Sequence, residues 1–236
     1  MAAPAFRAAS AILAVQNGTA DGTLTLPTHQ TDDILIIATF RKSLTNTLTI
    51  SGWTQIATWD GGLYRNYIFG KRAASGSETN PLLDWASTSG DFFALCCSYS
   101  GCITTGTAWE VVGSGQNGTG NDPTLTGITT LSAESLVLPI ILYGDDNNTA
   151  FALTSTDPAA YTEHYVESLV GSDGSVMISE GARSSAGATG DIAVSGLTVT
   201  VGREWNAIVL ALIPPAAGGG SNGFRARATH MIGGAF

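Results

Sequence analysis

Side chains that commonly carry catalysis are sparse in this sequence of 236 residues. Its three histidines, His29, His164 and His230, are isolated from one another, so none belongs to a recognisable catalytic arrangement. The sequence also lacks a Gly-x-Ser-x-Gly elbow, the His-x-x-x-His and Cys-x-x-Cys patterns of zinc sites, and a phosphate loop ending in Gly-Lys-Ser or Gly-Lys-Thr. We therefore predict no enzymatic activity, no cofactor and no metal site.

Acidic residues are the remaining candidates for chemistry, because paired carboxylates serve glycoside hydrolysis or bind calcium. Asp32-Asp33 precedes an apolar run, and Asp145-Asp146 opens a polar turn, but neither has the alternating oxygen ligands of a calcium loop. We interpret Asp145-Asp146 as a solvated turn, with a weak cation site and catalysis as alternatives. A hydrolase would need distant acids, such as Asp60, Asp91 and Glu110, to converge in one cleft.

Tryptophans are candidates for sugar binding, since exposed aromatic rings stack on sugars. Trp53, Trp59, Trp85 and Trp109 all lie near expected turns in the first half of the chain. Large aromatic side chains also fill cores and subunit contacts, and this is our first interpretation of the four. Glycan binding by these tryptophans is the alternative.

Three cysteines, Cys96, Cys97 and Cys102, fall within seven residues of one another. Neighbouring residues on a strand point to opposite faces, so Cys96 and Cys97 are poorly placed to form a disulfide with each other. We predict that all three are small buried thiols of a protein made in a reducing cytosol.

Composition excludes two classes of partner. Charged residues make up 12% of the chain, against roughly 25% in typical soluble proteins, and the net charge is −9 with only two lysines. No basic stripe is available to neutralise a series of phosphates, so we expect no nucleic-acid binding. No apolar run approaches the roughly 18 to 20 residues of a membrane helix, and the first residues lack a signal-peptide pattern, so we expect no membrane association.

Short apolar or alternating runs, bounded by Gly, Asn, Asp and Pro, predict strands along the whole body. The expected strands are 6–16, 22–26, 33–40, 46–50, 53–59, 63–73, 91–100, 108–112, 124–130, 135–143, 161–169, 174–184, 190–200 and 204–213. A helix over 158–169 is the alternative at one place, because Asp157 would cap it and Pro158 would fit its first turn. The predicted fold is all-β: a jelly-roll-like antiparallel β-sandwich with an extended C-terminal arm.

Three landmarks recur in the same order in both halves and indicate an internal repeat. Asp33 to Ile37 is echoed by Glu134 to Leu138, Lys71 to Gly76 by Ala182 to Gly187, and Asp91 to Leu95 by Glu204 to Ile208. The body, 1–213, would then divide into halves 1–113 and 124–213, as two Greek keys of one jelly roll or as two stacked subdomains joined near 113–123. Chance matching in a chain rich in Gly, Thr and Ala is the alternative.

The end of the chain differs chemically from the body. All 19 acidic residues precede residue 214, and Pro214-Pro215 leads into a linker over 214–223 that is rich in Gly and Pro. Residues 224–236 then form an expected anchoring arm. We predict that it docks on a neighbouring subunit through the apolar Phe224, Met231, Ile232 and Phe236, with Arg225 and Arg227 meeting acidic patches. Folding of this tail back onto its own body is the alternative.

Several short landmarks resemble a known class of β-module. They are Asp33-Ile34-Leu35-Ile36, Ser51-Gly52-Trp53-Thr54, Tyr67 to Lys71 with Ala73, Tyr99-Ser100-Gly101, and Trp205-x-Ala207 in a strand that ends at Pro214. This pattern resembles the β-sandwich, jelly-roll-like modules of tailed-bacteriophage virion structural proteins and of related bacterial surface proteins. The resemblance implies a non-enzymatic structural or adhesive role, and it carries over no catalytic residues.

Composition, tail and resemblance together predict a virion protein made in the cytoplasm of the host bacterium. The leading expectation is a capsid decoration or cement protein that forms a homo-oligomer, with a trimer as the working guess. Its arm would bind neighbouring virion proteins such as the major capsid protein. The alternatives are a tail, baseplate or fibre component, and an adhesin that binds a host glycan.

Overall fold

The structure, a computed structural model, describes residues 2–15, 21–85, 91–144, 151–169, 174–196 and 204–215. Within these ranges the secondary structure is β-strand with no helix, and all the strand pairs are antiparallel. The prediction of an all-β chain with antiparallel sheets is confirmed. The alternative helix over 158–169 is wrong, because Thr162–Leu169 pairs as a strand with Gly174–Ala182.

Two six-stranded sheets form the centre of the molecule. The strands of the first are β1 (Ala5–Ala9), β2 (Leu13–Val15), β4 (Ile34–Arg41), β6 (Thr54–Gly61), β7 (Tyr64–Arg72) and β9 (Phe92–Ser100). Those of the second are β10 (Trp109–Val112), β11 (Gln116–Thr119), β14 (Leu136–Tyr143), β16 (Thr162–Leu169), β17 (Gly174–Ala182) and β20 (Glu204–Leu212). The first has the order β1-β9-β4-β7-β6, with β2 also on β9, and the second has β10-β20-β14-β17-β16, with β11 also on β20.

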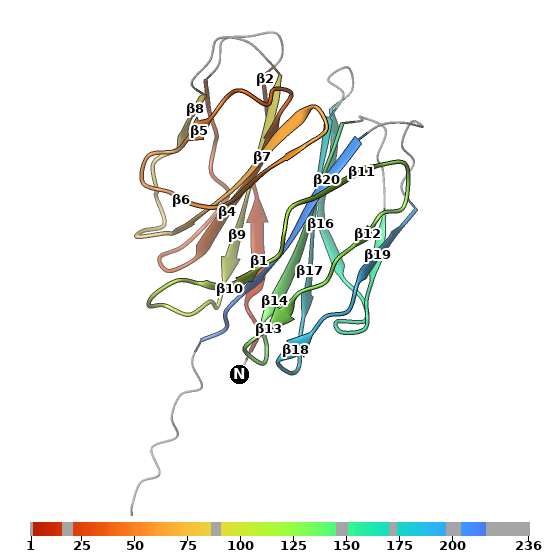
Figure 1. The fold of residues 1–236 in the computed structure, drawn as a ribbon. Helices are drawn as coiled ribbons and strands as arrows, with labels where there is room; N and C mark the ends of the chain where they lie inside the picture. Colours follow the sequence, from red (N-terminus) through yellow and green to blue (C-terminus); the bar gives the residue numbers. More distant parts are fainter. Residues whose placement is uncertain are drawn as a thin grey trace, which may run out of the picture.

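Smaller sheets cover the outer faces. A three-stranded sheet of order β3-β8-β5 belongs to the first half, and one of order β12-β19-β15 belongs to the second. Their strands are β3 (Gly22–Thr23), β5 (Leu48–Thr49), β8 (Leu82–Trp85), β12 (Thr124–Leu125), β15 (Ala152–Thr154) and β19 (Ile192–Ser195), and β13 (Thr129–Thr130) pairs with β18 (Gly187–Ala188) as a further two-stranded sheet. Figure 1 shows β5 and β8 at one outer side of the molecule and β12 and β19 at the other.

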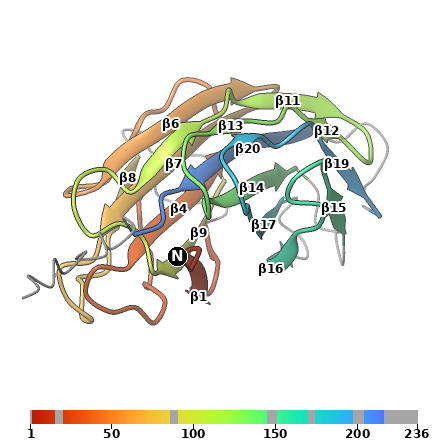
Figure 2. The same ribbon diagram turned by 90° about the horizontal axis from the view of Figure 1, so that it is seen from below.

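The layers enclose three apolar cores. One lies between the two six-stranded sheets and takes residues from both of them, including Ile36 and Ile140. A second lies between the first sheet and its small outer sheet, and a third lies between the second sheet and its own. The view from below in Figure 2 shows the strands of the two halves arranged as these stacked layers.

This layering explains why the central strands are apolar without alternation. Side chains on a strand point alternately to its two faces, and both faces of β4 and β14 are covered. In β4, Ile36 enters the shared core and Ile37 the outer core of the first half; in β14, Ile140 and Ile141 divide in the same way between the shared core and the outer core of the second half. A continuous buried run therefore indicates a strand between two layers.

The two six-stranded sheets match in detail as well as in strand order. A bulge interrupts β1 between Phe6 and Ala8, and another interrupts β10 between Trp109 and Val111. A second pair of bulges interrupts β6 between Gln55 and Ala57 and β16 between Glu163 and Tyr165. A bulge marks a fixed position along a strand. Because the bulges recur at corresponding places of the two sheets, residues at the same distance from them are equivalent.

The same equivalence applies to the turns that lead into β4 and β14. Asp32 and Glu134, each two residues before its strand, both have a left-handed backbone, with φ of 68° and 62°. Such φ values are uncommon for residues other than glycine.

The sequence landmarks lie on matching strands, with an adjustment of register. Asp91 and Glu204 occupy equivalent positions, because Phe92 pairs with Arg41 as Trp205 pairs with Tyr143. The other two landmark pairs are offset by one residue. Asp33 is equivalent to Ser135, and not to Glu134, because the carbonyl of Asp33 accepts a hydrogen bond from the N–H of Ala73 and the carbonyl of Ser135 accepts one from the N–H of Arg183.

Strand β10 already belongs to the second sheet. The chain therefore crosses between the sheets within 101–108, before the expected junction near 113–123.

Two seams join the edges of the six-stranded sheets. Strand β1 of the first sheet contacts β16 of the second, and β6 of the first contacts β11 of the second. At each seam, the first edge of one sheet thus meets the last edge of the other sheet. Such reciprocal contacts are expected when two similar units pack about an approximate two-fold axis.

Candidate functional site

The predicted anchoring residues cannot be placed. Phe224, Arg225, Arg227, Met231, Ile232 and Phe236 all lie outside the described residues, as do Asp145 and Asp146. Docking of the arm on a neighbouring subunit therefore stays a prediction.

The four tryptophans singled out in the sequence lie in different places. Trp85 is buried between the first sheet and its small outer sheet, and Trp53 packs beside the same core. Trp59 and Trp109 are half-buried against the shared core. The four rings thus divide between the two faces of the first sheet and do not form one platform for a sugar.

The cysteines are placed as their spacing predicts. Cys96, Cys97 and Cys102 are all buried and free, with Cys97 in the shared core and Cys96 in the outer core of the first half. Burial raises the pKa of Cys97 and of Cys102 to about 12, so both thiols stay protonated near neutral pH. None of the three is placed to act as a nucleophile.

One histidine that is isolated in the sequence acquires partners at the seam between β1 and β16. The ring of His164 stacks on Phe6 with the centroids 4.0 Å apart, and its Nε2 lies 2.8 Å from Oε1 of Glu180. The backbone N–H of Phe6 donates to the other oxygen of Glu180 at 3.1 Å. This cluster attaches the first strand of the chain to the second sheet.

The equivalent positions in the other seam hold a different set of side chains. Trp109 stands where Phe6 does, Ile56 where His164 does and Gly70 where Glu180 does. A Cβ atom on Gly70 would lie 2.7 Å from Ile56 and from the Trp109 ring, so glycine is required for this close packing. At these three positions the second seam is apolar, whereas the first contains a histidine and carboxylate pair.

The acids considered for hydrolysis are engaged separately. Glu110 on β10 accepts hydrogen bonds from the backbone N–H groups of Leu131 and Ser132 and from the hydroxyls of Ser132 and Ser135. Asp60 instead forms an ion pair with Arg65 on the outer face of the first sheet. These two carboxylates thus serve different elements.

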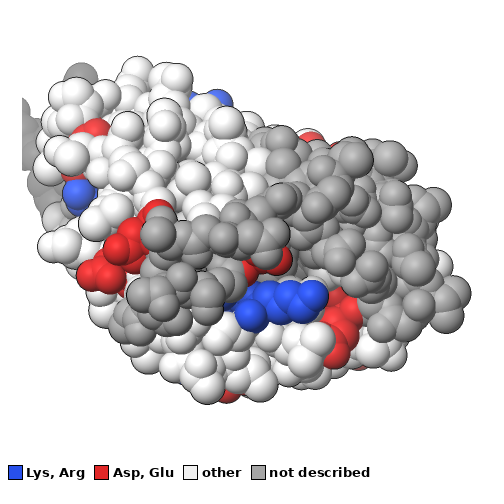
Figure 3. All heavy atoms as spheres, turned by 90° about the horizontal axis from the view of Figure 1, so that it is seen from above, with Lys and Arg blue, Asp and Glu red and all other residues white. Residues whose placement is uncertain are grey.

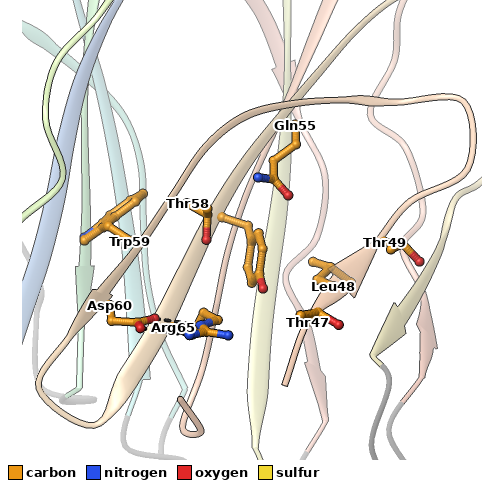
Figure 4. Close-up of a pocket in the computed structure, with 9 residues that line it drawn as sticks. Thr47, Leu48, Thr49, Gln55, Thr58, Trp59, Asp60 and Arg65 are labelled. Atoms are coloured by element: carbon orange, nitrogen blue, oxygen red, sulfur yellow. Dashed lines mark hydrogen bonds and ion pairs between the residues drawn. The ribbon is translucent and has the colours of Figure 1, made fainter. Parts of the chain in front are cut away.

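A hollow lined by both apolar and polar side chains lies beside that ion pair. It has a volume of about 450 Å³ and lies between the end of the β6–β7 hairpin and the segment that contains β5. Its lining residues are Thr47, Leu48, Thr49, Gln55, Thr58, Trp59, Asp60, Arg65 and Tyr67. Figure 4 shows Gln55, Thr58, Asp60 and Arg65 on the pocket side of the hairpin, and the Trp59 ring pointing away from it.

The hairpin fixes the two charged groups of this pocket. Asp60 pairs directly with Arg65 across the β6–β7 ladder, and Gly62, with φ of 57°, forms the turn between them. The guanidinium donates two hydrogen bonds to the carboxylate, at 2.6 and 2.8 Å. These bonds hold the pKa of Asp60 below its usual range, so the pair is fully ionised at neutral pH.

A buried phenol forms the floor. Tyr67 is 3% exposed, packs against Trp85, and donates its hydroxyl proton to the carbonyl of Asn46 at 3.3 Å. That bond connects β7 to the segment just before β5. The pocket is therefore built on paired strands and a fixed wall. Asp60 and Trp59 are the residues of this lining that the sequence pattern singles out, and that pattern does not indicate the pocket.

Among the described residues no group of three His, Cys, Asp or Glu side chains is arranged to hold a metal ion. No described segment is a helix long and apolar enough to cross a membrane. No protein-family model, curated protein or solved structure matches this chain.

Proposed function

We propose that this chain is a structural protein of a bacteriophage particle, acting as a decoration or cement protein on the capsid surface. The observation that carries the proposal is the strand order within each half. In a jelly roll, eight strands divide between two sheets in the orders first-eighth-third-sixth and second-seventh-fourth-fifth. If β1 and β2 count as one strand, β1-β9-β4-β7 gives the first order and β3-β8-β5 gives three strands of the second.

The second half repeats this order with β10-β20-β14-β17 and β12-β19-β15. On this proposal the body consists of two jelly-roll modules packed back to back. In each module the fifth strand, β6 or β16, extends the large sheet and leaves the small one with three strands. Jelly rolls are common in viral capsid proteins and in lectins, and this support is an analogy of fold.

Surface composition supports assembly with other subunits. Among the described residues, four leucines are substantially exposed: Leu131 at 73%, Leu63 at 58%, Leu82 at 52% and Leu44 at 41%. On the face seen from above in Figure 3, the charged side chains gather in a few places, and most of the described surface around them is uncharged. A rigid body with few charges and outward leucines suits a subunit that buries part of its surface against copies of itself or a shell.

The proposed assembly is a homo-oligomer, specifically a trimer, that is anchored through 224–236. A tail, baseplate or fibre position is the alternative within the same particle. Both predict a protein found in purified virions, and they differ in where it is attached.

Reconstitution tests this proposal. The purified full chain is mixed with capsids of the encoding phage that lack it, and bound protein is measured by co-sedimentation. We expect saturable binding by the full chain and none by a chain ending at Pro215, whose circular dichroism shows a folded body. Absence of binding by the full chain would contradict the cement role, and equal binding by the shortened chain would contradict anchoring through the arm.

A further inference from the structure

The residues at Asp60 and Arg65 differ from those at the equivalent positions of the second half. At the positions where the first sheet pairs Asp60 with Arg65 and Thr58 with Tyr67, the second sheet pairs Ser168 with Ser175 and Val166 with Met177. The backbone ladder is the same in both sheets. The fold therefore does not require an ion pair or a phenol at these positions.

The surroundings of the ion pair leave both of its partners accessible. The side chain of Asp60 is 46% exposed and that of Arg65 is 23% exposed. A carboxylate has about four acceptor positions and a guanidinium has five N–H donors, so the two bonds between them leave further acceptors and donors. Exposed ion pairs contribute little to stability, which leaves the presence of this pair unexplained by folding alone.

The opposite wall adds neutral groups. Thr47 and Thr49 are exposed on either side of the buried Leu48, and β5 is the outer strand of its three-stranded sheet. Gln55 and Thr58 on β6 face this wall across the pocket (Figure 4). The hydroxyl, amide and backbone groups of the two walls therefore offer both donors and acceptors.

Charge and size define the class of ligand. Asp60 and Arg65 are the charged residues of the lining, and their charges cancel, so a charged ligand would meet no net counter-charge. The volume of about 450 Å³ lies within the roughly 300–1,000 Å³ of small-molecule sites. Neighbouring hydroxyls of a sugar each donate and accept hydrogen bonds, and the carbon face of a sugar ring suits the threonine methyl groups and the phenol floor.

We propose that this pocket is a binding site for a neutral saccharide, with Asp60, Arg65, Gln55 and Thr58 as its hydrogen-bonding groups. The pocket lies in the first half. It does not depend on the position of the protein in a particle, and it differs from the tryptophan-based sugar site considered from the sequence, because the Trp59 ring points away from it.

Saturation-transfer difference NMR on the full chain tests the proposal. The probes are glucose, galactose, mannose, rhamnose and N-acetylglucosamine, each titrated in the millimolar range. Asp60→Asn keeps the shape of the side chain but removes its charge, and Thr58→Val removes one hydroxyl while leaving the ion pair intact. Thr54→Val is the matched control, because Thr54 is an exposed threonine on the same strand that does not line this pocket.

We expect saturable transfer to at least one sugar, binding about tenfold or more weaker in Asp60→Asn, a smaller loss in Thr58→Val, and no change in Thr54→Val. Circular dichroism and thermal melting verify that each variant is folded. The proposal is overturned if no sugar gives a saturable signal with the unmodified chain. It is also overturned if both pocket variants bind as the control does.

Discussion

Replacing Ile140 by alanine tests whether the two six-stranded sheets share one core. Ile140 is fully buried on β14 and belongs to the core that both sheets form. Removing three carbon atoms from such a position leaves a cavity and costs about 2–5 kcal/mol of the free energy of unfolding. Because the cavity borders both sheets, the loss should weaken the first half as well as the second.

The neighbouring residue provides the matched control. Ile141 is equally buried, but it faces the outer core of the second half. Ile141→Ala should cost a similar amount, about 2–5 kcal/mol, with its local effect confined to the second half. Urea unfolding measures the total cost, and hydrogen exchange with mass spectrometry locates it.

The two variants should differ in the first sheet. We expect Ile140→Ala to accelerate amide exchange in β4 and β9 as well as in β14, whereas Ile141→Ala should accelerate it in β14 and β19. Faster exchange in the second half alone for both variants would refute a shared core. A cost below about 1 kcal/mol for Ile140→Ala would refute its close packing.

Three further predictions concern a buried hydrogen bond, the thiols and the surface. The amide of Asn66 donates to Oδ1 of Asn206 at 3.0 Å in a buried position between the halves, so Asn206→Ala should cost about 1–3 kcal/mol in urea unfolding, and a neutral result would contradict the role of this bond. Burial raises the pKa of Cys97 and Cys102 to about 12, whereas thiols of the unfolded chain ionise near 8.5. The contribution of these thiols to the free energy of unfolding is therefore complete below about pH 8, and it declines by about 1.4 kcal/mol per thiol and pH unit from about pH 9 towards 12. Cys97→Ala should reduce the slope of the free energy of unfolding against pH in this range, and an unchanged slope would contradict this. Leu131 is 73% exposed, so Leu131→Ser should leave unfolding within about 0.5 kcal/mol of the original but weaken self-association in light scattering, and an unchanged mass distribution would remove it from the subunit contact.

The central strands could be predicted from the sequence because burial on both faces makes them continuously apolar. Strands β4 and β14 are of this kind, and their expected ranges agree with the structure to within one residue. Strand β11, Gln116–Thr119, contains no apolar residue and pairs with β20 along four positions. Its conformation is set by that partner, so no local pattern indicates it.

The candidate pocket could be predicted only in part. Two glycines after Asp60 signal a tight hairpin, and such a turn places Asp60 opposite Arg65. The facing wall around Leu48 lies earlier in the chain and reaches the pocket through packing of the outer sheet. Likewise, the pairing of His164 with Glu180 depends on a bulge in β16, which shifts the register by one residue. Such long-range register has no signature in local periodicity.

The most direct test of the proposed role is a reconstruction of intact particles of the encoding phage at side-chain resolution. We expect density for the two stacked six-stranded sheets on the outer surface of the capsid, with 216–236 continuing onto an adjacent subunit. Density on the tail, baseplate or fibre would contradict the decoration role. Absence of this chain from the particle would contradict a virion function altogether.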